Sequence, residues 1–215
     1  MTSKLFTLSS LLALAFTNSA DAALIATAVS STSETNYAPS SVDLLHGLTP
    51  TTTGASFSGD TNALNDGVSI SGDLTATGGN MYLNNTNPGT VTMTFDLTGS
   101  VTGYDLSSIV SDAGWLANSQ FHASQNYQVL VSLVGSSDYN PLVLTSGAVS
   151  GGNVSYDPFI GGGAGYTRVT ITNDSGPTIA SGVDGIRFIM TNLPLNNIEN
   201  DTVYREIDVF GTASA

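Results

Sequence analysis

Two distant stretches of the chain carry the carboxylates best suited to chemistry. The segment ALNDGVSISGDLT, residues 63–75, places Asp66 and Gly67 in a turn and Asp73 seven residues after Asp66. The segment YREIDVFG, residues 204–211, places Glu206 within a strand-like pattern. Calcium takes about six to eight oxygen ligands, and a tight turn can supply carbonyl oxygens beside a carboxylate. Asp-Gly is also among the strongest hairpin-turn signals, so residues 63–75 taken alone favour a plain turn. They also lack the spacing of an EF-hand loop.

No other part of the sequence presents a catalytic constellation. The two histidines, His46 and His122, have no G-x-S-x-G or HExxH pattern beside them, so we interpret both as surface or loop residues. The GGGAG run at residues 161–165 is not followed by G-K-[ST], and we interpret it as a flexible turn rather than a phosphate loop. A pair of carboxylates for glycoside hydrolysis needs only a spatial separation, and nothing in the sequence selects such a pair. We therefore expect a protein that is not an enzyme.

Trp115 is the only tryptophan and lies in DAGWLANSQF, after a short candidate strand. An exposed tryptophan would form a platform on which a sugar ring can stack. A tryptophan buried in the core is the more common outcome, and the sequence favours that structural role.

The charge and cysteine content exclude several classes of function. The formal net charge is -13, and no Lys or Arg occurs between Leu5 and Thr167. Such a chain has little with which to neutralise phosphates, which argues against nucleic acids and anionic membrane surfaces as partners. The absence of cysteine excludes disulfides, thiol nucleophiles, zinc thiolate sites and iron–sulfur clusters. Divalent cations and neutral ligands remain compatible with this composition.

The first 22 residues have the three parts of a secretory signal: Lys4, the apolar run LFTLSSLLALAF and the small-residue ending NSADA. We predict cleavage after Ala22 and a secreted, extracellular or periplasmic protein. The apolar run is shorter than the roughly 20 residues that span a bilayer, and no later segment approaches that length, so we expect no membrane insertion and no anchor.

Short segments of alternating apolar and polar residues predict strands at 91–97, 127–134, 167–172, 185–190 and 204–211. Weaker strand patterns lie at 24–30, 68–76, 81–84, 108–110 and 141–146. Turn formers such as NNTNPG and GSSDYNP separate them, and no mature segment shows a convincing helical face. This arrangement predicts an all-β sandwich or jelly roll. Its predicted core comprises Val91, Met93, Phe95, Val129, Val131, Val169, Ile171, Ile186, Phe188, Ile207 and Val209. Arg168 and Arg187 are predicted to point outward.

In order along the chain, the segments VTMTFDL, YDLSSIVSDAGW, QNYQVLVSLVGSSDYNPL, RVTIT, ASGVDGIRFIM and YREIDVFG resemble the galactose-binding-like, discoidin (F5/8 type C) jelly-roll superfamily. The resemblance covers roughly residues 60 to 211 and is most specific at YREIDVFG. It implies a jelly-roll β-sandwich at 61–212, with residues 23–60 packed on it as an N-terminal strand and loops, and a tail at 213–215.

The resemblance also implies a structural calcium ion between an early D-G turn and a glutamate of the closing strand. Matched to this sequence, the ligands are Asp66 with nearby carbonyls and Glu206, and Asp73 is a weaker addition. Alternation along the closing strand places Glu206 with Tyr204 and Asp208 on one face. Arg205 falls on the more apolar face, where we expect it to contact a carboxylate or loop carbonyls.

The function that this resemblance favours is an exported, non-catalytic binding module for a glycan or another extracellular surface ligand. A purely structural protein of an envelope or extracellular matrix is the alternative, and a glycoside hydrolase comes third. The sequence selects no ligand-binding residues for a sugar.

Overall fold

The computed structural model of the protein describes residues 23–32, 37–54, 57–68, 81–83, 89–115, 122–158, 165–191 and 202–215. Asp73 lies outside these residues, as does most of the weak strand prediction at 68–76. The described residues contain no α-helix; a short 3-10 helix, η2, spans Thr61–Leu64. None of the helices found there is long and apolar enough to cross a membrane.

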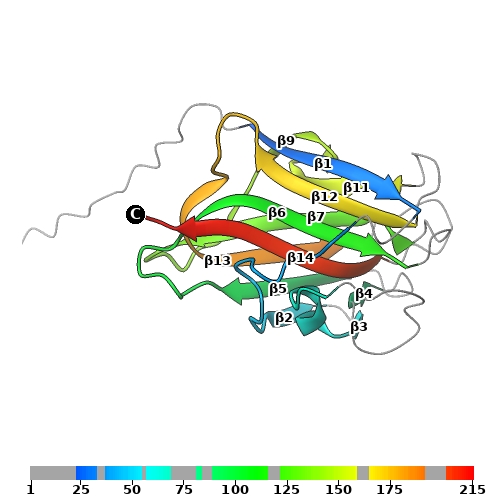
Figure 1. Ribbon diagram of the computed structural model, residues 1–215, viewed down its shortest axis with the longest axis horizontal. Helices are drawn as coiled ribbons and strands as arrows, with labels where there is room; N and C mark the ends of the chain where they lie inside the picture. Colours follow the sequence, from blue (N-terminus) through cyan, green and yellow to red (C-terminus); the bar gives the residue numbers. More distant parts are fainter. Residues whose placement is uncertain are drawn as a thin grey trace, which may run out of the picture.

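The strands form a hydrogen-bonded network that folds into two layers (Figure 1). The first layer contains β9 (Leu144–Gly147), β1 (Leu24–Ser31), β12 (Tyr166–Asn173), β6 (Tyr104–Gly114), β14 (Thr202–Ala213), β4 (Met81–Leu83) and β3 (Phe57–Gly59) in spatial order. The second contains β10 (Val149–Ser150), β11 (Asn153–Tyr156), β7 (Gln125–Leu133), β13 (Ala180–Thr191), β5 (Thr90–Asp96) and β2 (Thr51–Gly54), with β8 (Asn140–Pro141) paired to β7. The start of β13 also pairs with β6 and links the layers. The predicted all-β sandwich is therefore confirmed.

The closing strand β14 occupies a central position in the first layer, between β6 and β4. The N-terminal strand β1 is also internal, since it pairs with β12 on one side and with β9 on the other. Both ends of the described chain thus contribute strands to the same layer, and Figure 1 shows β1 and β14 running on either side of β12 and β6.

The core lies between the two layers and contains every residue that the alternating pattern predicted to be buried. The Tyr127 ring connects the layers, since it lies edge to face 6.2 Å from Tyr204 of the first layer and 6.1 Å from Phe188 of its own layer. Phe188 also meets Phe95 at 6.2 Å in the same manner. Edge-to-face pairs add specific geometry to the area that these rings bury.

Truncating Phe188 to Ala should lower the free energy of unfolding by about 3 to 5 kcal/mol, because the side chain is fully buried and its neighbours can collapse only in part. Urea denaturation of the protein measures this loss. Val101 is 93% exposed, so Val101→Ala serves as the control and should change stability by less than about 0.5 kcal/mol. Equal effects of the two substitutions would contradict the assignment of Phe188 to the core.

Candidate functional site

The outer face of β14 is buried although it carries two carboxylates. Glu206 and Asp208 are only 1% and 2% exposed, while Ile207 and Val209 face the core on the other side. Residues 37–48 cover this outer face, and the Leu44 amide donates to the Val209 carbonyl at 2.7 Å. A strand buried on both faces cannot leave its charged groups to water, so each carboxylate needs a partner within the protein.

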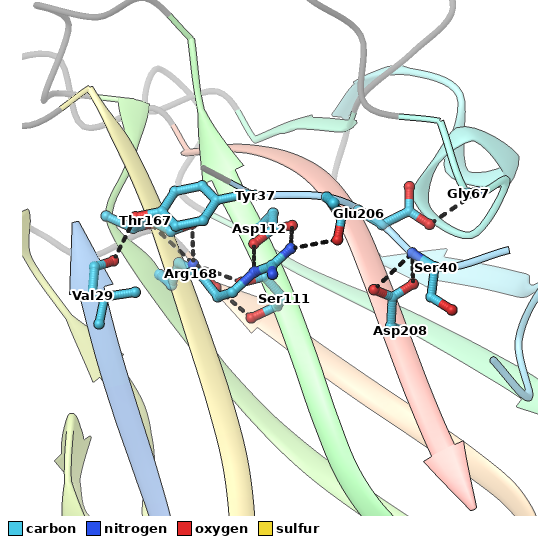
Figure 2. Close-up of polar contacts among 12 residues, drawn as sticks. Val29, Tyr37, Ser40, Gly67, Ser111, Asp112, Thr167, Arg168, Glu206 and Asp208 are labelled. Carbon is cyan, nitrogen blue, oxygen red and sulfur yellow. Dashed lines mark hydrogen bonds and ion pairs between the residues drawn. The ribbon is translucent and has the colours of Figure 1, made fainter. Parts of the chain in front are cut away.

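Asp208 and Asp43 are held by main-chain amides. The Ser40 amide donates to both carboxylate oxygens of Asp208, at 3.3 and 3.2 Å (Figure 2). Asp43 Oδ1 accepts hydrogen bonds from the amides of Leu45 at 2.7 Å and Val209 at 3.4 Å. Burial, and after it the charge of the nearby Asp43, raise the pKa of Asp208 to about 7. Burial also raises the pKa of Asp43, against the effect of its amide donors.

Glu206 meets the Asp66–Gly67 turn. The Gly67 amide donates to Glu206 Oε1 at 3.1 Å (Figure 2), whereas Oε2 is buried and has no hydrogen-bond partner. Asp66 is exposed, and its Oδ1 accepts from the Val68 amide at 2.8 Å. Burial raises the pKa of Glu206 to about 9, and repulsion from Asp208, Asp66 and Asp43 contributes to the rise.

The turn can approach β14 this closely because residue 67 is glycine. Its φ of +73° is a conformation that other residues rarely adopt. A Cβ at this position would also lie 2.9 Å from the Ser41 Cα, so the main chain at Ser41 blocks any side chain. The structure therefore brings together the early turn and the closing-strand glutamate named from the sequence.

Another buried oxygen lies beside this turn, on Asn65. The Asn65 amide nitrogen donates to the carbonyls of Leu45 and Leu48, the latter at 2.8 Å, while its Oδ1 has no partner. Asp43 Oδ2 is likewise buried without a partner. We call the set Asp43, Asn65, Asp66, Gly67, Glu206 and Asp208 the closing-strand junction. Sequence reasoning missed Asp43, Asn65 and the role of Asp208, because no local spacing links residues 43 and 65 to the last strand.

A bidentate ion pair fixes the neighbouring part of the same face. Arg168 donates from Nε to Asp112 Oδ1 at 2.7 Å and from a terminal nitrogen to Oδ2 at 2.6 Å. Its guanidinium lies 5.1 Å from the centroid of the Tyr37 ring and also donates to the Ala38 carbonyl. Asp112 is the register partner of both Arg168 and Glu206, so the three charges form one row across β12, β6 and β14 (Figure 2). Because Arg168 forms its ion pair with Asp112, it does not neutralise the charge of Glu206.

A β-bulge at Arg205 changes the predicted alternation of the closing strand. The register shifts between Tyr204 and Glu206, which turns Tyr204 into the core, so its predicted place on the Glu206 face is wrong. Arg205 is 3% exposed and its guanidinium lies 5.3 Å from the centroid of the Tyr166 ring. The positive charge of Arg205 lowers the pKa of Asp112, against the rise that burial causes, so Arg205 lies near this carboxylate.

Trp115 lies at the end of β6 and stacks on His122. The ring centroids are 4.6 Å apart with the planes tilted by 43°. Both side chains are half-buried, and Trp115 is absent from the buried core, so its predicted burial in the core is wrong. Tyr166 donates from its hydroxyl to the Trp115 carbonyl at 3.2 Å and holds this end of β6 against β12. This aromatic pair lies at the same end of the sandwich as Glu206, since β6 and β14 are antiparallel and Tyr204 pairs with Ala113.

Comparisons with known proteins find no matching family model and no matching curated protein. Solved structures with a similar arrangement include the CBM32-5 module from Clostridium perfringens in complex with GalNAc-β-1,3-galactose, at 14% identity and a TM-score of 0.41, covering 87% of this chain and 94% of that one. A fucose-binding module from Streptococcus pneumoniae matches at 19% identity and a TM-score of 0.34, covering 80% and 96%. An F5/8 type C domain from Bacteroides fragilis matches at 12% identity and a TM-score of 0.34, covering 78% and 98%.

The buried carboxylates predict that the stability of the protein depends on pH. The pKa of Glu206 is raised from 4.5 to about 9 in the folded state, so the folded state holds its proton more tightly than the unfolded state does. This contribution to stability is complete below pH 4.5 and is lost as the pH rises to about 9. The raised pKa of Asp208 causes a further loss of stability as the pH rises from 3.8 to about 7.

Urea denaturation in the presence of chelator should show that the free energy of unfolding decreases from about pH 5 through pH 7 to pH 9. Glu206→Gln should make this decrease smaller, by roughly 1 to 3 kcal/mol at the highest pH. Gln keeps an oxygen to accept from the Gly67 amide but cannot ionise. Asp138→Asn removes a charge from an exposed loop and should retain the wild-type slope. A wild-type slope in Glu206→Gln would show that Glu206 titrates normally.

Proposed function

We propose that this protein is an exported, non-catalytic carbohydrate-binding domain whose closing-strand junction holds one structural calcium ion. The observation that carries the carbohydrate assignment is the Trp115–His122 pair, a half-buried aromatic surface at one end of a rigid sandwich. Aromatic faces stack on the apolar faces of sugar rings, and neighbouring polar groups select their hydroxyls. Export is proposed from the signal-like first 22 residues.

The absence of catalysis is proposed from the burial of the clustered carboxylates. Glycoside hydrolysis needs two carboxyl groups on either side of a bound glycosidic bond. Glu206 and Asp208, which lie two residues apart on one face, are at most 2% exposed. Residues 37–48 cover both carboxylates, so a polysaccharide cannot reach them. Their raised pKa values follow from this burial and not from a place in an open cleft.

Calcium is proposed for the closing-strand junction because its charges and oxygens are not balanced within the chain. Glu206 Oε2, Asp43 Oδ2 and Asn65 Oδ1 are all buried without hydrogen-bond partners. Hard oxygen donors of this kind suit calcium, and a bound divalent cation would offset the repulsion among Glu206, Asp208 and Asp43. No group of three or more His, Cys, Asp or Glu side chains in the described ranges is arranged to hold a metal ion. The proposed ligands are therefore Glu206 and Asp66 with carbonyl and amide oxygens, and Asp73 remains an additional candidate.

Calcium should raise the melting temperature of chelator-treated mature protein, with about 2.7 kcal/mol of stabilisation at a free concentration of 100 times its dissociation constant. Magnesium should replace it poorly, because its smaller shell demands a strict octahedron. Thermal unfolding with calcium, magnesium or chelator measures this response, and Asp66→Ala and Glu206→Gln should both weaken it. A full calcium response in both variants, or no response in the wild type, would leave Asp66 as a turn residue and Glu206 as a buried acid.

Trp115→Ala should abolish binding to glycans retained by the wild type on a glycan array, because the stacking surface is lost. The variant should fold normally, since Trp115 lies outside the core, and its melting temperature checks this. The substitution Val42→Ala, at an 87% exposed side chain, is the control and should bind as the wild type does. A mature protein that binds no glycan with or without calcium would favour the alternative, a structural protein of an envelope or extracellular matrix.

A further inference from the structure

Arg187 on β13 is held in a fixed position on the outer face of the second layer. Its Nε donates to Thr94 Oγ1 on the adjacent strand β5 at 3.0 Å. Its guanidinium carbon lies 3.8 Å from the centroid of the Tyr139 ring. The hydrogen bond and the stacking contact together orient the guanidinium plane, and both leave its two terminal nitrogens available.

The Tyr139 ring reaches this place because residue 185 is glycine. A Cβ on Gly185 would lie 2.6 Å from Tyr139 Oη and 2.7 Å from Ser132 Oγ. Gly185 and Arg187 are two residues apart on the same strand and therefore share the outer face. The glycine thus creates the recess that lets the ring lie beside the guanidinium.

Arg187 differs from the other two arginines of the mature sequence. Arg168 is ion-paired with Asp112, and Arg205 is buried against Tyr166. Arg187 is half-buried, and no carboxylate in the described part of the chain lies within 4.0 Å of it. An accessible, oriented guanidinium without an acidic partner is suited to bidentate recognition of a carboxylate.

The surroundings of Arg187 are polar on one side and acidic on the other. Toward the end of β13, the outer face presents Ile189 with its register partners Thr92 and Gln128, followed by Thr191, which accepts from Asn126 Nδ2 at 2.6 Å. Toward the start of β13, Asp96 is the register partner of Gly185, and Asp184 accepts at 2.6 Å from the Ser132 hydroxyl that borders the Gly185 recess. Asp96 and Asp184 repel an anionic ligand on one side of Arg187, which leaves the uncharged surface toward Ile189 as the place for it.

We propose that Arg187, oriented by Tyr139, binds the carboxylate of a uronic acid unit in an acidic glycan, with the remainder of the glycan lying over Ile189, Thr92 and Gln128. This inference rests on the proposed carbohydrate binding and adds a second contact surface, on the sheet face and not at the Trp115 end. A guanidinium–carboxylate pair on this surface discriminates between an acidic sugar and its neutral counterpart.

The test is binding of the full mature protein, by calorimetry, to oligomers of glucuronic, galacturonic and mannuronic acid and to the neutral hexose oligomer that matches each. At least one acidic oligomer should bind more tightly than its neutral match, and its affinity should fall as salt is added. Arg187→Gln should remove this preference, with a loss of about tenfold or more for the acidic oligomer and little change for the neutral one. Arg187→Lys should restore the charge but only part of the affinity, because it lacks the planar fork.

Gly185→Ala tests the positioning of the ring without removing the guanidinium. The added methyl group displaces Tyr139 and crowds the Ser132 hydroxyl, so the preference for the acidic oligomer should weaken, and the melting temperature measures any accompanying loss of stability. Ser137→Ala, an exposed change in the loop that carries Tyr139, should behave as the wild type.

The outcomes separate this inference from the carbohydrate proposal. Glycan binding that depends on Trp115 but shows no acidic preference, or a preference that Arg187→Gln retains, would overturn the role of Arg187 alone. Absence of binding to every oligomer and to the glycan array would overturn both.

Discussion

The burial of carboxylates on the outer face of β14 is the constraint on which the rest of this structure depends. Glu206, Asp208 and Asp112 lie on neighbouring strands of one face, and Asp43 reaches the same place from the covering segment. Burying an unpaired charge is costly, so each of these groups must be matched by a guanidinium, an amide, a proton or a cation. Arg168 matches Asp112, and main-chain amides match Asp208 and Asp43 in part. Glu206 retains one oxygen with no partner.

The same constraint explains how the N-terminal part of the chain joins the sandwich. β1 contributes a strand to the first layer, and the chain then crosses the outer face of that layer, where it is fixed by Tyr37, Ser40 and Leu44. Residues 65–67 approach from another side and bring the Gly67 amide to Glu206. Three parts of the chain that are distant in sequence thus meet at the acidic groups of the last strand. A cation at this junction would fasten all three, which links the proposed calcium site to the stability of the fold.

Much of the architecture could be predicted from the sequence because strands with one buried face leave a clear alternating pattern. Met93, Phe188 and Ile171 are examples, and each lies in the core. The alternating pattern was less informative in strands that pair on both edges, because such strands continue through polar residues. β6 spans Tyr104–Gly114, although only residues 108–110 carried a recognisable signal. The short strands β2, β10 and β11 were missed, since segments of two to four residues are too short to show a period. At the site, Glu206 and the Asp66 turn were predicted through a resemblance, whereas Asp43 and Asn65 join them only through tertiary contacts. The bulge at Arg205 could not be predicted, because one extra residue in a strand leaves no mark on composition.

The proposed calcium site requires that the closing-strand junction exchange a proton for calcium, and calorimetry measures this exchange directly. Titrating calcium into the metal-free mature protein at pH 7, in buffers with different enthalpies of ionisation, gives the number of protons released with each ion. Glu206 has a pKa of about 9 in the metal-free fold and is protonated at pH 7, whereas Asp208, with a pKa of about 7, is about half protonated, so we predict one binding event that releases at least about one proton per calcium. Release should fall by about one proton in Glu206→Gln. Calcium binding with no proton release, or release that Glu206→Gln leaves unchanged, would contradict the account.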